Sequence, residues 1–130
     1  MIFLMLLCMF FCHIVDDYYL QGWLASGKQQ KWWKQNAPQE MYKHDYIMAL
    51  AEHAFSWAFM IHVPIMLYML FNKTVIGVAL ICSVIIDMVI HAVVDNAKAN
   101  KLIINLVQDQ MIHFFQIIAT WLYYCVMLNF

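Results

Sequence analysis

The stretch His13-Ile14-Val15-Asp16-Asp17-Tyr18-Tyr19-Leu20-Gln21 decides the expected fold, because it places polar side chains at the end of an apolar segment. The twelve residues before it carry no charged side chain, so both parts are expected to lie on one membrane-spanning helix. Residues four apart share a helix face, which puts His13, Asp17 and Gln21 on one polar stripe. An imidazole and a carboxylate are costly in hydrocarbon unless they are paired, hydrated or bound to a metal. The stretch therefore predicts a buried polar site in a helical membrane protein.

The composition also indicates an integral membrane protein. Of the 130 residues, 65% are apolar and only 12% are charged. A soluble domain has about half of its residues apolar and about a quarter charged. The net charge of −1 gives no sign of nucleic-acid binding. The length suits a single domain with three or four membrane spans.

We expect an all-α fold in which four transmembrane helices form an antiparallel bundle. The predicted spans cover about residues 1–23, 46–71, 75–94 and 102–128. The apolar start lacks the basic residues and the small-residue cleavage site of a signal peptide, so it is expected to be a retained span. Pro64 falls inside the second span, where it would kink the helix without ending it. The connection 28–43 mixes lysines with tryptophans, which predicts a short amphipathic segment in the headgroup region.

The lysines predict the orientation of the chain in an inner or plasma membrane. The first and third connections carry six of the seven lysines, and the second carries only Lys73. Because positive residues accumulate in cytoplasmic connections, we expect both termini on the non-cytoplasmic side. Membrane lipids are the expected surroundings. A second copy of the chain or another membrane protein is a candidate partner.

The imidazole–carboxylate spacing of the first span occurs twice more, at the end of the third span and the start of the fourth. Under the predicted topology all of these positions lie in the cytoplasmic halves of their spans, within roughly 15 Å of the interface. This convergence predicts a metal site near the cytoplasmic face. The predicted metal ligands are His13, Asp17, His53, His91, Asp95, Asp109 and His113.

These seven side chains exceed the four that a tetrahedral zinc ion needs, so one or two divalent ions are expected. Mixed nitrogen and oxygen ligands make zinc the leading candidate, with manganese or iron as alternatives. Gln21 and Gln110 are expected to support the ligands or to contact a substrate. A proton or ion pathway and a purely structural polar network are the alternative explanations of the pattern.

The predicted function is metal-dependent hydrolysis of a phosphorylated lipid or amphiphile at the cytoplasmic face. The metal would polarise a phosphoryl oxygen and activate a water molecule. Asp17, Asp95 or Glu52 would accept the proton of that water, and Lys98 with Lys101 would hold the phosphate. One alternative is a non-enzymatic protein that binds a host membrane partner and has a structural metal or polar network. Another is an ion or metal transporter, although beyond Asp87 and His62 the outer halves of the spans look too apolar for a polar path.

The motifs resemble those of a family of small bacterial and phage membrane proteins of unknown function. That family carries HxxxD-F-x-L-Q, a single histidine on the second span, HxxxD followed by a lysine, and DQxxH. The matching residues are His13, Asp17, Leu20 and Gln21; His53; His91, Asp95 and Lys98; and Asp109, Gln110 and His113. Tyr18 stands where the family prefers phenylalanine. The chain is also distantly similar to membrane-bound metal-dependent hydrolases, and that similarity implies hydrolase activity at a site of histidines and aspartates.

Overall fold

The fold is all-helical, as predicted. The computed structural model describes residues 2–74 and 77–129, and within these ranges it contains helices and no strands. The four long helices are α1 (Ile2–Val15), α4 (Asp45–Asn72), α5 (Gly77–Ala99) and α6 (Leu106–Met127). The shorter elements are a π-helical turn (Asp16–Leu20), α2 (Leu24–Gly27), α3 (Gln30–Asn36) and a 3-10 turn (Glu40–Tyr42).

Within residues 2–74 and 77–129, three helical stretches are long and apolar enough to cross a membrane. They are Ile2–Leu20, Glu40–Asn72 and Gly77–Ala99. Large apolar side chains such as Phe55 on α4 and Ile86 on α5 are exposed, as expected for surfaces that face lipid. More polar residues lie along α6, including Asp109 and Gln116, and this helix is not among the three.

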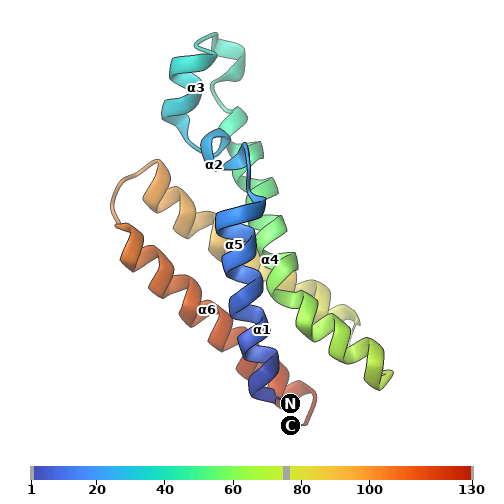
Figure 1. The fold of residues 1–130 in the computed structure, drawn as a ribbon. Coiled ribbons are helices and arrows are strands. Elements are labelled where there is room, and N and C mark those ends of the chain that lie inside the picture. The colour runs from blue at the N-terminus through green and yellow to red at the C-terminus, as the bar shows by residue number, and fades with distance from the viewer. Residues whose placement is uncertain (1, 75–76, 130) are drawn as a thin grey trace.

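The four long helices pack in a closed cycle. Helix α1 contacts α4 and α6, and α5 contacts the same two helices. Figure 1 shows both chain termini at one end of the molecule and α2 with α3 at the other. The interior contains fully buried apolar side chains, among them Met9, Trp57 and Ile117. The polar residues predicted to form the site lie at the ends of the helices away from the termini, near α2.

Several helix ends differ from the predicted spans. Helix α5 continues to Ala99, past the predicted end near residue 94, because Asp95 is buried and paired inside the protein instead of facing water. Helix α6 begins at Leu106, where Asn105 and Gln108 form a reciprocal capping box. The predicted starts of the first and third spans, at residues 1 and 75, lie outside the described residues.

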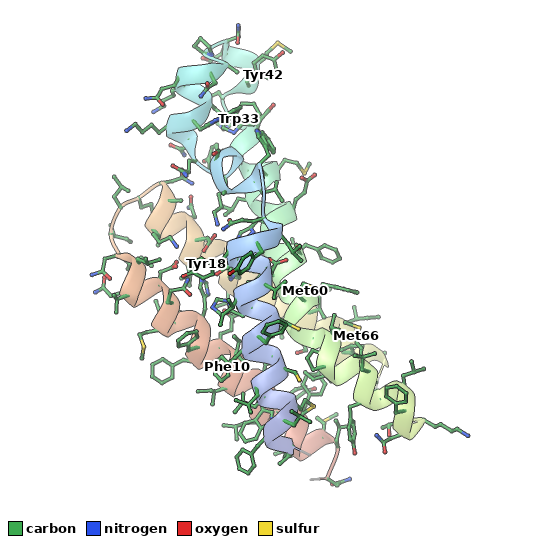
Figure 2. The ribbon with its side chains drawn as sticks, in the orientation of Figure 1. Phe10, Tyr18, Trp33, Tyr42, Met60 and Met66 are labelled. Atoms are coloured by element: carbon green, nitrogen blue, oxygen red, sulfur yellow. The ribbon has the colours of Figure 1, made fainter. Side chains whose placement is uncertain are left out.

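The segment predicted for the headgroup region forms a small aromatic cap over the polar end of the bundle. The rings of Trp32 and Trp33 meet edge to face with their centroids 5.0 Å apart. Trp33 also stacks on Tyr42, and Figure 2 labels both side chains at this end. Asn100 at the end of α5 accepts a hydrogen bond from the backbone N–H of Gln30 at 2.8 Å. This contact ties the start of α3 to α5.

Candidate metal centre

Residues from all four long-helix regions meet in one buried cluster. Its imidazoles are completely buried, and its carboxylate residues are at most 7% exposed. The π-helical turn after α1 contributes Asp17, and α4 contributes His53. Helix α5 contributes His91 and Asp95, and α6 contributes Asp109 and His113. Six of the seven predicted ligands are therefore brought together.

Asp95 is the central carboxylate of this cluster. Its Oδ1 lies 3.3 Å from Nε2 of His113 and 3.7 Å from Nε2 of His91. Its Oδ2 lies 3.2 Å from Nε2 of His53. Three imidazoles on three helices thus point the same ring nitrogen at one carboxylate.

Two further carboxylates face the same imidazoles. Asp17 Oδ1 lies 3.4 Å from His53 Nε2, and Asp109 Oδ1 lies 3.5 Å from His113 Nε2. Both oxygens are buried and have no hydrogen-bond partner among the described residues. A buried carboxylate oxygen without a partner is destabilising, and coordination to a cation would remove that cost. The donor set therefore fits a metal ion.

In the part of the chain that the structure describes, two overlapping sets of donors have spacings suited to an ion. One set is Asp17, His53 and His91, and the other is His91, Asp95 and His113, with the donor atoms of each set within 4.8 Å of one another. Nitrogen and carboxylate oxygen donors suit divalent zinc, manganese or iron. His91 belongs to both sets, but its Nε2 has a single lone pair and binds only one ion. The two sets cannot both be completed through that atom.

His13 lies beside the cluster with both ring nitrogens engaged by protein groups. Trp57 Nε1 donates to His13 Nδ1 at 2.7 Å. An indole N–H can only donate, so the His13 proton is on Nε2, which donates to Gln110 Oε1 at 3.1 Å. Gln110 in turn donates to Asp109 Oδ2 at 3.1 Å. These hydrogen bonds let His13 orient Gln110 and Asp109, and its assignment as a metal ligand stays a prediction.

The π-helical turn after α1 explains how consecutive aspartates both reach the interior. Gln21 N donates to Asp16 O at 3.1 Å, across five residues. Neighbouring side chains on a regular α-helix point about 100° apart, yet Asp16 and Asp17 are only 0% and 7% exposed. Asp16 Oδ1 accepts a hydrogen bond from Ser56 Oγ at 2.6 Å. Gln21 does not continue the predicted stripe, because its half-buried amide donates to the backbone oxygen of Asp17.

Lys28, which the mixture of lysines and tryptophans places in the predicted headgroup segment, lies at the site. Its side chain is buried, and Nζ lies 2.5 Å from Asp95 Oδ2. Lys98 Nζ lies 2.5 Å from Asp109 Oδ2 in the same way. Each ammonium therefore pairs with a carboxylate that also faces a cluster imidazole. The 67 residues between Lys28 and Asp95 explain why no local spacing rule identifies this pair.

A cavity of about 180 Å³ adjoins the cluster. Its lining includes Asp17 and Asp95, the side chains of both lysines, and the two predicted glutamines. Gln21, Gln110 and Lys98 thus lie where a substrate could reach them. Glu52 does not, because it is exposed on α4 while its neighbour His53 is fully buried. The predicted role of Glu52 as proton acceptor therefore gains no support from the cavity, and Lys101 is likewise exposed.

A second buried polar network lies between α5 and α6, on the side of the centre away from α2 and α3. Asp87 Oδ1 accepts from Gln116 Nε2 at 2.8 Å, and Asp87 Oδ2 accepts from Thr120 Oγ1 at 2.7 Å. His62 of α4 and Ser83 of α5 extend the network with a contact of 2.8 Å between Nε2 and Oγ. The network contains Asp87 and His62, the two residues excepted from the prediction of apolar outer halves, and adds Ser83, Gln116 and Thr120 to them.

Comparisons with known proteins add no relative. No protein-family model, curated protein or solved structure matches the chain. The family resemblance of the motifs stays a prediction. The interpretation of the centre therefore depends on its own geometry.

Proposed function

We propose that the chain is an integral membrane protein with four antiparallel spans, of which α6 is the fourth. The polar residues that lower the hydropathy of α6 face inward, since Asp109 and His113 are fully buried. Its outward side chains are apolar, with Phe115 and Val126 exposed by 65% and 76%. Such a helix is compatible with lipid on one side and a polar interior on the other. The lysine distribution supports a cytoplasmic location for α2, α3 and the metal centre.

We propose that the centre binds one divalent ion, with zinc as the leading candidate. The charge balance of the ionisable groups at the centre and next to it supports this number. With neutral imidazoles, the carboxylates exceed the ammoniums by two charges, which one divalent ion neutralises. A second divalent ion would leave an excess of two positive charges. The groups in this balance are Asp16, Asp17, Asp95 and Asp109 with Lys28 and Lys98.

The proposed reaction is hydrolysis of a phosphoester on a lipid or other amphiphile. The cavity of about 180 Å³ is the observation that carries this proposal, because it joins metal-binding carboxylates to two ammoniums. Ammonium groups bind phosphate oxygens through charge-assisted hydrogen bonds. When bound, the metal would supply charge stabilisation of the phosphoryl oxygen and activation of water.

Asp17 is the proposed proton acceptor. It lines the cavity, and it is free to accept a proton when the one ion is held by the donor set of His91, Asp95 and His113. Asp95, in contrast, is surrounded by imidazoles and paired with Lys28. The water oxygen bonds to phosphorus while the bond from phosphorus to the ester oxygen breaks. The water proton passes to Asp17 and is available for the departing alcohol oxygen.

The test is product release by the full chain reconstituted in lipid. Protein loaded with zinc, manganese or iron is incubated with phospholipids and isoprenyl phosphates, and released phosphate or alcohol is measured. We expect Asp17→Asn to reduce turnover at least about a hundredfold, because it removes the proton acceptor. Glu52→Gln is the matched control, since it neutralises an exposed carboxylate on α4 and should retain activity. Wild-type turnover no higher than that of Asp17→Asn with every metal would overturn the hydrolase.

The second polar network favours movement of protons or ions as a second candidate function. Ser83, Asp87, His91 and Asp95 recur every four residues on α5 and are all buried. This spacing produces one polar stripe that continues beyond the metal centre. Proteoliposomes containing a pH-sensitive dye would test it. Proton flux that wild type supports and Asp87→Asn abolishes would favour this function over hydrolysis.

A further inference from the structure

The Lys28 ammonium occupies a position where a cation would bind Asp95. Lys28 Nζ lies 2.5 Å from Asp95 Oδ2, and His53 Nε2 lies 3.2 Å from the same oxygen. A divalent ion held by that oxygen and that imidazole would be within a few ångströms of the ammonium. Two positive charges at this spacing in a buried site repel each other strongly. The ammonium and the metal therefore compete for one carboxylate oxygen.

Lys28 can leave Asp95 without unfolding its segment. Asn100 Nδ2 donates to the backbone oxygen of Lys28 at 3.0 Å, and Lys28 N donates to Leu24 O at 3.0 Å. Neither contact involves the ammonium. A lysine side chain has a flexible four-carbon stem, so rotation of that stem is enough to move the charge.

The adjoining cavity offers the displaced ammonium new partners. Lys28, Gln21 and Lys98 all line it. Gln21 Oε1 is a buried acceptor that has no hydrogen-bond partner among the described residues. Lys28 can therefore turn toward Gln21 while staying inside the cavity wall. Two ammoniums beside a divalent ion would then attract an anion with several oxygen acceptors, and a phosphate group has this chemistry.

We infer that metal binding at Asp95 releases Lys28, and that Lys28 with Lys98 then binds a phosphate group in the cavity of about 180 Å³. The inference rests on the metal centre of the proposed function and not on hydrolysis. Metal and phosphate then strengthen each other's binding, because by linkage each must raise the affinity for the other by the same factor.

The experiment measures two affinities of the full chain in lipid nanodiscs. Manganese binding is followed by electron paramagnetic resonance, and binding of inorganic phosphate to the manganese-loaded protein by calorimetry. In Lys28→Met we expect manganese to bind about tenfold more tightly, because a competing charge is gone. We expect phosphate to bind about tenfold more weakly, because a charge-assisted hydrogen bond is lost. A residue that only supports the fold would weaken both affinities.

Two variants control for charge and for folding. Lys31→Met removes an exposed lysine of the same segment and should leave both affinities within about twofold of wild type. Lys28→Arg keeps the charge and should bind manganese as wild type does. Manganese affinity that is unchanged or lower in Lys28→Met would overturn the inference, as would unchanged phosphate affinity. Wild type that binds no manganese or no phosphate would also overturn it. If both affinities change as expected but no product is released, this inference is supported and only the proposed hydrolase activity is contradicted.

A comparison of two nanodisc compositions identifies the source of the phosphate group. Nanodiscs of phosphatidylcholine alone are compared with nanodiscs that contain phosphatidic acid, a lipid phosphate monoester. Phosphatidic acid that competes with inorganic phosphate in wild type, and less well in Lys28→Met, assigns the cavity to a lipid headgroup. Competition by soluble phosphate alone assigns it to a free anion.

Discussion

The Nε2 atoms of His53 and His91 lie 3.2 Å apart in the buried centre of the protein. Two imidazole nitrogens bound to one tetrahedral zinc at about 2.0–2.1 Å would be about 3.3–3.4 Å apart. The Nδ1 atoms of both rings are buried with no hydrogen-bond partner in the described residues. The pair joins α4 to α5 at the spacing of two ligands of one metal.

Purified protein is therefore expected to carry one divalent transition-metal ion per chain. His91→Ala combined with His113→Ala removes two of the three imidazoles and should abolish metal content in elemental analysis. His62→Ala is the matched control, because His62 is fully buried but belongs to the second polar network. Metal-free wild type, or full metal content in the double variant, would contradict the metal centre.

Acid should release the ion. Ligand carboxylates must be ionised and ligand imidazoles neutral, so protons compete with the metal and occupancy falls as the pH is lowered. Removal by chelator at neutral pH should lower the melting temperature, because the ion no longer offsets the negative charges of the buried carboxylates Asp95 and Asp109. Metal content that does not change between neutral and mildly acidic pH would contradict coordination by these groups.

His13 should behave differently from the ligands. His13→Ala keeps the coordinating atoms but removes the hydrogen bond that orients Gln110 beside Asp109. Loss of such an outer partner costs about 10–100-fold in metal affinity without abolishing binding. Competition with a chelator of known affinity measures this difference. If His13→Ala instead loses its metal as completely as the His91→Ala/His113→Ala variant, His13 is itself a ligand.

Much of the centre was predictable, because its polar residues interrupt apolar runs at helical spacing. His91 with Asp95 and Asp109 with His113 lie four residues apart, and local periodicity alone places each pair on one face. The same rule fails at Gln21, because a π-helical turn changes the register after Val15. In that turn Asp16 accepts a hydrogen bond from Ser56 of α4, a contact between distant residues that no local pattern records.

Two other parts of the structure depend on contacts between distant residues. Lys28 follows a glycine in a polar stretch, and only packing of the cap on α5 brings its ammonium to Asp95. Gln116 and Thr120 are weakly polar residues that occur in many helices. Only the structure shows that both side chains donate hydrogen bonds to the buried Asp87 carboxylate.

Reporter fusions test the proposed orientation. Because Figure 1 places both termini at one end, reporters fused before Met1 and after Phe130 should give the same answer. The lysine distribution predicts that both report the non-cytoplasmic side, whereas a reporter inserted near Pro38 reports the cytoplasm. A C-terminus in the cytoplasm would reverse the orientation and move the metal centre to the other leaflet.

Thr120→Ala should destabilise the protein without affecting its metal. The Thr120 hydroxyl donates to Asp87 Oδ2 at 2.7 Å, in a network separate from the metal donors. Hydrogen bonds between membrane helices contribute about 0.6 kcal/mol on average and up to about 1.7 kcal/mol. We therefore expect a loss of about 1 kcal/mol in the free energy of unfolding, measured by denaturation in mixed micelles. Thr120→Ser keeps the hydroxyl and should lose less. If Thr120→Ala instead lowered metal affinity as much as His13→Ala, the two networks would be energetically coupled, and the polar stripe on α5 would act as one continuous unit.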